Sequence, residues 1–177
     1  ECTPDRLGGD RMRIEILKKH NQVFREFPEV GGLIFFCYND YRTHMGDKGV
    51  GVMKQRVHGV VDLYGVRKPS FEELRREASP VEAVEIRPEK EKWRVRIRTR
   101  NTVPAYTLRG YRLRAIAYGF GDLPMEQKEY SLPDLPPGGS ASLEVVLASK
   151  DARRIRFEIV RPTGFSAFTA VHEISGK

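Results

Sequence analysis

Residues 31–44 read GGLIFFCYNDYRTH, and the rest of the chain is organised around this stretch. It opens with two glycines, continues through five apolar residues at 33–37 and turns polar from Asn39 onward. A short apolar run with such boundaries predicts a strand buried on both faces, as in a parallel sheet. Polar residues at the carboxyl end of a strand of this kind are where open α/β sheets and (β/α)8 barrels place their chemistry.

An amphipathic pattern precedes this stretch. Apolar residues at positions 12, 16, 23 and 27 repeat with helical spacing, which predicts a helix that runs from Asp10, as its N-cap, to Phe27. Pro28 would end the helix because proline cannot continue it. Only three residues then precede Gly31, and a connection this short is typical of helix-to-strand joins in α/β folds.

A long irregular segment follows the stretch. Residues 39–58 match neither the helical nor the strand period, and we interpret them as a functional loop. A brief extended piece over residues 59–64 comes next. Ser70 and Glu73 then have the spacing of a capping box, which predicts a second helix over residues 70–78.

From residue 81 onward the apolar period changes from helical spacing to two. Clusters of Pro, Gly, Asp and Asn separate most of the short alternating runs, and the spacing is typical of an immunoglobulin-like β-sandwich. The predicted strands are 81–87, 92–101, 108–118, 126–132, 142–148, 154–160 and 166–174. We therefore predict a mainly β chain with two domains, a short α/β segment at 1–80 and a sandwich at 81–177.

The composition is that of an ordinary soluble protein. Hydrophobic residues make up 40% and charged residues 31% of the 177 residues, and the net charge is +7. No run approaches the roughly 18 apolar residues of a membrane span, so we expect no membrane partner. Cys2 and Cys37 stand in different contexts and predict reduced thiols. The four histidines have no zinc-like spacing, and we expect neither a metal nor a cofactor. The sequence is compatible with a cytoplasmic, a periplasmic or a secreted protein.

Residues 10–80 resemble the end of the catalytic barrel of family 2 glycoside hydrolases, the β-galactosidase and β-glucuronidase group. The segment FCYNDY at 36–41 matches the last barrel strand, and Gly59 and the Lys68–Pro69 pair match the elements that follow it. Many members carry a Trp where Phe36 stands. The segment QRVHG at 55–59 replaces the motif with which glucuronidases hold a uronic acid, so the resemblance favours a β-galactosidase-like substrate.

The resemblance implies that the chain is the C-terminal portion of a retaining glycosidase that hydrolyses O-glycosidic bonds. Such enzymes need two carboxylates about 5–5.5 Å apart, and the resemblance implies that both lie upstream of Glu1. No catalytic residue is therefore expected in this chain, which would be inactive alone. Its expected partners are a carbohydrate substrate in the intact enzyme and the rest of the barrel.

The candidate substrate-binding residues lie at the end of the predicted strand and of the long loop. Aromatic rings supply flat apolar surface for a sugar ring, and the polar side chains can bind its hydroxyls. Local ion pairs that brace the loop are the alternative role for the charged members. The candidates are Phe36, Tyr38, Asn39, Asp40, Arg42, His44, Arg56 and His58.

The strand WRVRIRTRN at 93–101 places four arginines on one face. We interpret them as the solvent-exposed face of an antiparallel sheet, with their charge offset by Glu residues on neighbouring strands. Arg112 and Arg114 on the following strand would extend this face. We expect no nucleic-acid partner. The alternative function for the whole chain is a non-catalytic carbohydrate-binding or protein-interaction β-sandwich module. If the barrel is incomplete, the apolar strand at 31–38 should pack against the sandwich or self-associate with another chain.

Overall fold

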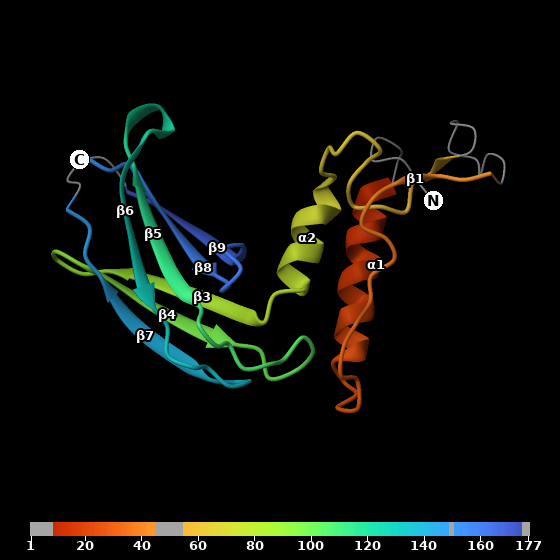
Figure 1. Ribbon diagram of the computed structural model, residues 1–177, viewed down its shortest axis with the longest axis horizontal. Helices are drawn as coiled ribbons and strands as arrows, with labels where there is room; N and C mark the ends of the chain where they lie inside the picture. Colours follow the sequence, from red (N-terminus) through yellow and green to blue (C-terminus); the bar gives the residue numbers. More distant parts are fainter. Residues whose placement is uncertain (1–8, 45–54, 149–150, 175–177) are drawn as a thin grey trace. The chain divides into compact units, whose positions relative to one another are not determined.

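The computed structural model describes residues 9–44, 55–148 and 151–174. The chain divides into two compact units, Glu1–Ala78 and Ser79–Lys177. The described part is mainly β, with antiparallel sheets and two α-helices (Figure 1). The predictions made for Glu1, for Cys2 and for the middle of the long loop lie outside the described residues.

The first unit contains helix α1, Gly9–Phe24, and helix α2, Pro69–Glu77, which pack against each other. The Asp10 carboxylate near the start of α1 accepts hydrogen bonds from the Ser70 amide at 2.6 Å and the Ser70 hydroxyl at 2.8 Å. Just beyond the other end of α1, Arg25 forms an ion pair of 2.6 Å with Glu77. The amino-terminal ends of α1 and α2 therefore lie together, and so do their carboxyl-terminal ends. The two helices run in the same direction.

The predicted capping box is wrong. Lys68 is the N-cap residue of α2, and Ser70 lies in the first turn, where Asp10 from α1 satisfies its amide. Asp10 itself lies inside α1, so its carboxylate serves the other helix rather than capping its own. Capping boxes are local rules, whereas here the free amides of a helix start are satisfied by a carboxylate 60 residues away.

The prediction of a buried strand at 31–38 is also wrong. The segment forms no strand, and the side chain of Ile34 is 99% exposed. A buried strand needs a hydrogen-bonded neighbour on each side, and the described residues provide only a bridge from Asn39 to Val61. Strands form instead at the two ends of the predicted loop. There β1, Tyr41–Arg42, pairs antiparallel with β2, Gln55–Arg56.

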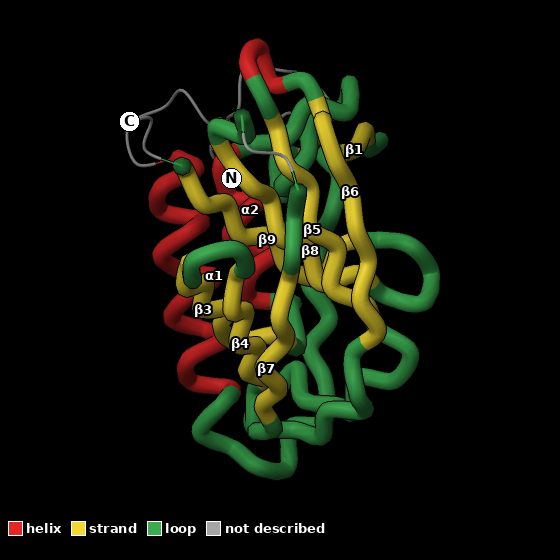
Figure 2. The backbone as a smooth tube through the Cα atoms, turned by 90° about the vertical axis from the view of Figure 1, so that its left-hand side faces the viewer, coloured by secondary structure: helices red, strands yellow, loops and turns green. Residues whose placement is uncertain are grey.

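The described residues of the second unit form seven strands in two antiparallel sheets, as the periodicity of the sequence predicts. The three-stranded sheet has the order β3-β4-β7 and the four-stranded sheet the order β6-β5-β8-β9 (Figures 1 and 2). The strands are β3 (Val81–Pro88), β4 (Trp93–Thr99), β5 (Arg112–Tyr118), β6 (Pro124–Ser131), β7 (Ser140–Val145), β8 (Arg154–Val160) and β9 (Ser166–Glu173).

One apolar core lies between these two sheets, as in a β-sandwich. Val95 and Ile97 of β4 are fully buried and belong to the same cluster as Leu113 of β5 and Phe157 of β8. The ring of Trp93 lies 6.2 Å from that of Phe157, across the two sheets. The alternation of buried and exposed residues along β4 therefore sends its apolar set inward and its arginines outward.

The predicted extension of the arginine face to Arg112 and Arg114 is wrong. Both residues lie on β5, which belongs to the other sheet, and both pair with Glu129 of the adjacent β6. Strands that follow each other in sequence can belong to different layers of a sandwich, so period two alone does not reveal which arginines share a face. Among the described residues, neither helix is long and apolar enough to cross a membrane.

Candidate functional site

A buried ion pair links the polar end of the 31–44 stretch to the start of α2. The Lys68 ammonium lies 2.6 Å from the Asp40 carboxylate, and the two side chains are only 4% and 2% exposed. The amide of Gly59 donates to the same carboxylate at 2.9 Å, and the Gly59 carbonyl accepts from Lys68 at 2.9 Å. Every group in this junction therefore has a hydrogen-bonding partner, as a buried charge requires.

Gly59 is the residue that allows this close approach. A Cβ atom at this position would lie 2.3 Å from backbone atoms of Asn39 and Asp40, closer than any real contact. The backbone bonds from the Asp40 amide to the Val61 carbonyl, at 2.8 Å, and from the Lys68 amide to the Val60 carbonyl, at 2.9 Å, hold the same three segments together. We refer to Asp40, Gly59 and Lys68 as the junction.

Three aromatic rings meet beside the junction. The Phe36 ring lies 6.0 Å from the Tyr41 ring and 6.3 Å from the His58 imidazole, and the Tyr41 and His58 rings are stacked at 6.1 Å. Phe36 is 73% exposed, whereas Tyr41 and His58 are half-buried. The three rings, which we call the aromatic cluster, thus present apolar surface and an imidazole to solvent.

A second aromatic contact comes from the same stretch. The Tyr38 ring packs edge-on against Phe71 of α2 at 6.0 Å, and the Arg67 guanidinium lies 4.4 Å from the centre of the Phe71 ring. Tyr38 remains 54% exposed. Such a cation–π contact orients a guanidinium beside exposed aromatic surface, where it can donate hydrogen bonds.

The remaining predicted site residues occupy different positions. Asn39, Arg42 and His44 are exposed, and Arg56, the register partner of Tyr41 in the β1–β2 ladder, is buried. Among the candidates, the structure brings Phe36 and His58 together through Tyr41, and it directs the Asp40 carboxylate inward to Lys68.

The thiol of Cys37 contacts the backbone of the same stretch. Its sulfur is 3.0 Å from the carbonyl oxygen of Asn39, to which the thiol donates a hydrogen bond. Burial raises the pKa of this thiol, and the negative charge of Asp40 raises it further. Cys37 is therefore held as the neutral thiol rather than as a reactive thiolate.

The predicted site residues did not include several residues that the structure puts at the site, among them Tyr41, Lys68 and Phe71. Tyr41 and Lys68 belong to the segments FCYNDY and Lys-Pro that carry the family resemblance, so the signal for both was present. Phe71 had no local signal, because its contact with Tyr38 spans 33 residues of sequence. In the described part of the chain, no group of three or more His, Cys, Asp or Glu side chains could hold a metal ion.

The arrangement as a whole suits the binding of a molecule with flat apolar faces and hydroxyl groups. The exposed rings of Phe36 and Tyr38 provide stacking surface. The His58 imidazole lies beside Phe36, and the Arg67 guanidinium lies over Phe71, the ring that Tyr38 contacts. The Asp40 carboxylate is buried and is bound by Lys68 and the Gly59 amide in the junction, so it does not face a ligand at the surface.

Comparisons with known proteins do not name a family. No family model matches the chain, and no curated protein matches it. Among solved structures it is similar to a penta-heme cytochrome c552 from Thermochromatium tepidum, with 12% sequence identity and a TM-score of 0.41. The similarity covers 58% of this chain and 41% of the cytochrome chain. A similarity this low carries no inference about fold or function.

Proposed function

We propose that the chain is the C-terminal portion of a retaining family 2 glycoside hydrolase, with β-galactosidase-like activity in the intact protein. The observation that carries the proposal is the aromatic cluster, in which the exposed Phe36 ring packs beside the half-buried rings of Tyr41 and His58 next to the junction. In this proposal the cluster forms part of the sugar-binding surface. The two catalytic carboxylates belong to strands upstream of Glu1, so the chain contributes to binding the substrate rather than to breaking its bond.

The junction supports the proposal because it joins the two segments that carry the family resemblance. Asp40 belongs to the FCYNDY segment and Lys68 to the Lys-Pro pair, and 28 residues separate them. Gly59, the third element of the resemblance, is the residue whose lack of a side chain permits their contact. Three separate points of a sequence resemblance thus meet at one buried contact.

The direction of the helices supports an origin in a barrel. Successive helices of a (β/α)8 barrel run parallel because each follows a parallel strand, and α1 and α2 run in the same direction with the extended segment between them. We propose that the rest of the catalytic barrel covers the apolar side chains that this chain leaves exposed in its first unit. These include Met12 at 52%, Ile16 at 47%, Phe27 at 53% and Ile34 at 99% exposure.

The second unit would be the supporting sandwich of that enzyme. Its seven antiparallel strands in sheets of three and four agree in number and layering with an immunoglobulin-like sandwich. The Cys–Trp–Cys framework of antibody domains is absent from the sequence, so the proposal is for the general architecture only. In this proposal the sandwich buttresses the barrel and takes no part in catalysis.

The test is an assay of the full-length protein that contains this chain, against a panel of nitrophenyl glycosides. We expect turnover of the β-galactoside by the full-length protein and none by the 177-residue chain alone. A full-length protein that turned over no glycoside would overturn the proposal. Binding of oligosaccharides without turnover would then favour the non-catalytic carbohydrate-binding module.

A pair of variants tests the role of the aromatic cluster. Phe36→Ala should lower kcat/KM by about tenfold, the loss expected when a ring that stacks on the sugar is removed. Tyr64→Ala is the matched control, because Tyr64 is an exposed aromatic residue of the same unit, 86% exposed, with no ring contact to the cluster. Equal effects of the two substitutions would show that Phe36 does not contact the substrate.

A further inference from the structure

The outer face of the three-stranded sheet contains a hollow of about 300 Å³ that the proposed function does not use. Its lining residues are Glu85 and Arg87 of β3, Arg94 and Arg96 of the central β4, and Ser142 of β7. The strand register explains this grouping. Glu85, Arg96 and Ser142 lie opposite one another in one row across the sheet, and Arg87, Arg94 and Glu144 form the next row on the same face.

Most arginines of this face have a carboxylate partner. Arg94 donates from Nε to Glu89 at 2.6 Å, and Arg98 donates to Glu82 at 2.7 Å. These pairs are what the sequence predicts for a wet sheet face with compensating glutamates. Arg87 and Glu85 are more loosely paired, at 3.8 Å.

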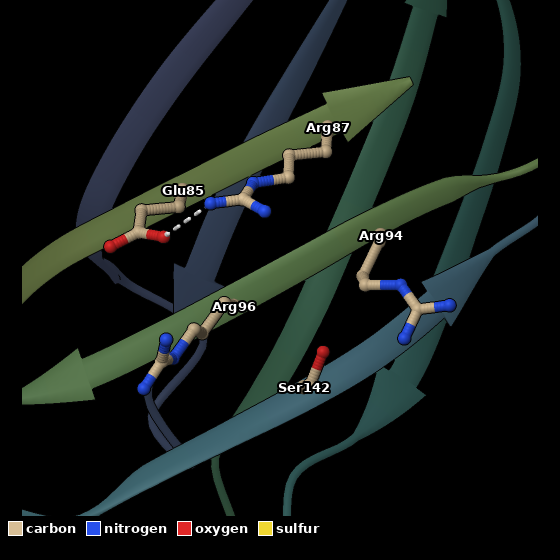
Figure 3. A pocket seen from close by; sticks show the side chains of 5 residues that line it. All are labelled: Glu85, Arg87, Arg94, Arg96 and Ser142. Carbon is tan, nitrogen blue, oxygen red and sulfur yellow. Dashed lines mark ion pairs between the residues drawn. The ribbon is translucent and has the colours of Figure 1, made fainter. Parts of the chain in front are cut away.

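Arg96 differs from its neighbours on β4. Although Glu85 lies directly opposite, that carboxylate turns toward Arg87, and the Arg96 guanidinium makes no hydrogen bond or ion pair with any described side chain. Figure 3 shows the Ser142 hydroxyl between the side chains of Arg94 and Arg96, with the Glu85–Arg87 pair on the other side of β4. Among the described residues, the Arg96 guanidinium of the hollow has no carboxylate partner, and the Ser142 hydroxyl beside it makes no side-chain hydrogen bond.

Positive side chains outnumber negative ones in the lining of the hollow. Arg87 lies directly opposite Arg94 in the antiparallel pair, and like charges in that position destabilise a sheet. Glu85 offsets the charge of Arg87, and Glu89 and Glu144 offset that of Arg94, so Arg96 carries the excess positive charge of the hollow. A bound anion would neutralise this charge, and guanidinium groups are well suited to the bidentate recognition of an oxyanion.

We propose that this hollow binds a tetrahedral oxyanion of the phosphate or sulfate class, either free or as an ester on a small molecule. The Arg96 guanidinium is the principal donor, the Ser142 hydroxyl donates a neutral hydrogen bond, and Arg94 contributes charge from the other side. A volume of about 300 Å³ lies at the small end of ligand pockets and leaves room for a small organic group attached to the anion. This inference is independent of the proposed glycosidase function.

A single-stranded nucleic acid fits this face less well. Proteins that bind single strands stack bases on exposed aromatic rings, and no aromatic side chain lines the hollow. The aromatic residue nearest in sequence, Trp93, packs toward Phe157 in the core. Glu82, Glu89 and Glu144 would also repel a polyanion that lay along the strand.

The test uses the 177-residue chain and isothermal titration at constant ionic strength. The probes are sodium phosphate, sodium sulfate, glucose 6-phosphate and glucose 6-sulfate, with glucose as the uncharged control. We expect saturable binding of the charged probes and none of glucose. Tighter binding of the two esters than of the inorganic ions would identify an ester as the ligand, and equal binding would identify the free ion.

Two arginine variants decide where the anion binds. Arg96→Gln should weaken binding by at least about tenfold, because it removes the charged donor. Arg98→Gln is the matched control, since it removes the same charge from the same face of β4 at a residue that Glu82 already pairs, and it should change binding less than about twofold. Ser142→Ala should weaken binding by about threefold.

Several results would overturn the proposal. The absence of saturable binding by all four charged probes would do so. Equal weakening by Arg96→Gln and Arg98→Gln would show general attraction by the charged face rather than a site. Binding of a single-stranded oligonucleotide that depends steeply on salt and weakens equally in both variants would assign the face to nucleic acid instead.

Discussion

The two units of the chain are stabilised in different ways. The second unit has a continuous apolar core in which Val95, Ile97 and Leu113 are completely buried, and its ion pairs lie on outer faces. The first unit reverses this arrangement. Its most deeply buried side chains include the charged pair of Asp40 and Lys68, while several of its large apolar side chains are exposed.

This difference indicates which unit has a core of its own. Burial of apolar surface is the main favourable term in folding, so a sandwich with a closed core is expected to be stable by itself. The first unit depends on specific polar contacts, among them the junction and the bonds of Asp10 and Arg25 to α2. Its exposed large apolar side chains, such as Ile34 at 99%, show that part of its apolar surface faces solvent.

Two spectroscopic probes can follow the units separately. The sequence contains one tryptophan, Trp93, which lies in the core of the second unit, so its fluorescence reports on the sandwich. Both described α-helices belong to the first unit, so circular dichroism at 222 nm reports mainly on that unit. If the two units are stabilised separately, by an apolar core in one and by polar contacts in the other, the two signals should respond to different substitutions.

The largest effect is expected from truncation of the sandwich core. Phe157→Ala removes a ring that is 1% exposed and contacts Trp93, and it should lower the free energy of unfolding by about 3–5 kcal/mol. Urea denaturation followed by Trp93 fluorescence measures the change. Phe165→Ala, at a residue that is 75% exposed, is the control and should change the value by less than about 0.5 kcal/mol. Similar losses for both variants would contradict the apolar core.

The next effect is expected in the polar junction. Lys68→Met leaves the Asp40 carboxylate buried without its partner, which should destabilise the first unit by about 3 kcal/mol. The change should appear in the 222 nm signal more than in the fluorescence. Arg67→Met is the control, because Arg67 is the exposed neighbour of Lys68 and should cost less than about 1 kcal/mol. The double variant Asp40→Leu/Lys68→Met should recover much of the loss, since no unpaired charge remains.

A steric test addresses the same junction with no change in charge. Gly59→Ala forces a methyl group against the backbone of Asn39 and Asp40, and it should destabilise the first unit by about 1–3 kcal/mol. Thermal denaturation followed at 222 nm measures the effect. Gly31→Ala is the control, because no atom lies within 4 Å of its added Cβ. A Gly59→Ala variant as stable as Gly31→Ala would mean that the three segments do not meet as described.

Sequence patterns identified the second unit far better than the first, for a physical reason. In an antiparallel sandwich each strand alternates between core and solvent, so Val95 and Ile97 reveal their burial through their spacing from Arg94 and Arg96. The turns between strands carry their own Pro and Gly signals. The predicted bounds of β8, residues 154–160, agree with the structure at both ends.

The first unit depends on contacts that local patterns do not encode. The bond between Asp10 and Ser70 spans 60 residues, and the Asp40–Lys68 pair spans 28. Period and capping rules operate within a few residues, so they assigned Asp10 and Ser70 to the wrong caps. Asp40 and Lys68 both belong to the segments that carry the family resemblance, but the periodicity and capping rules do not predict their contact.

The smallest effect is expected at the exposed apolar segment around Ile34. This substitution tests directly whether the first unit leaves apolar side chains exposed. Ile34 is 99% exposed, so Ile34→Ser should change the unfolding free energy of the 177-residue chain by less than about 0.5 kcal/mol. Leu17→Ala, at a residue of α1 that is 7% exposed, is the contrasting variant and should cost at least about 2 kcal/mol. A large loss for Ile34→Ser in this chain would mean that the segment is covered after all. If the barrel proposal holds, the same substitution in the full-length protein should cost far more than in this chain, because only there would Ile34 be buried.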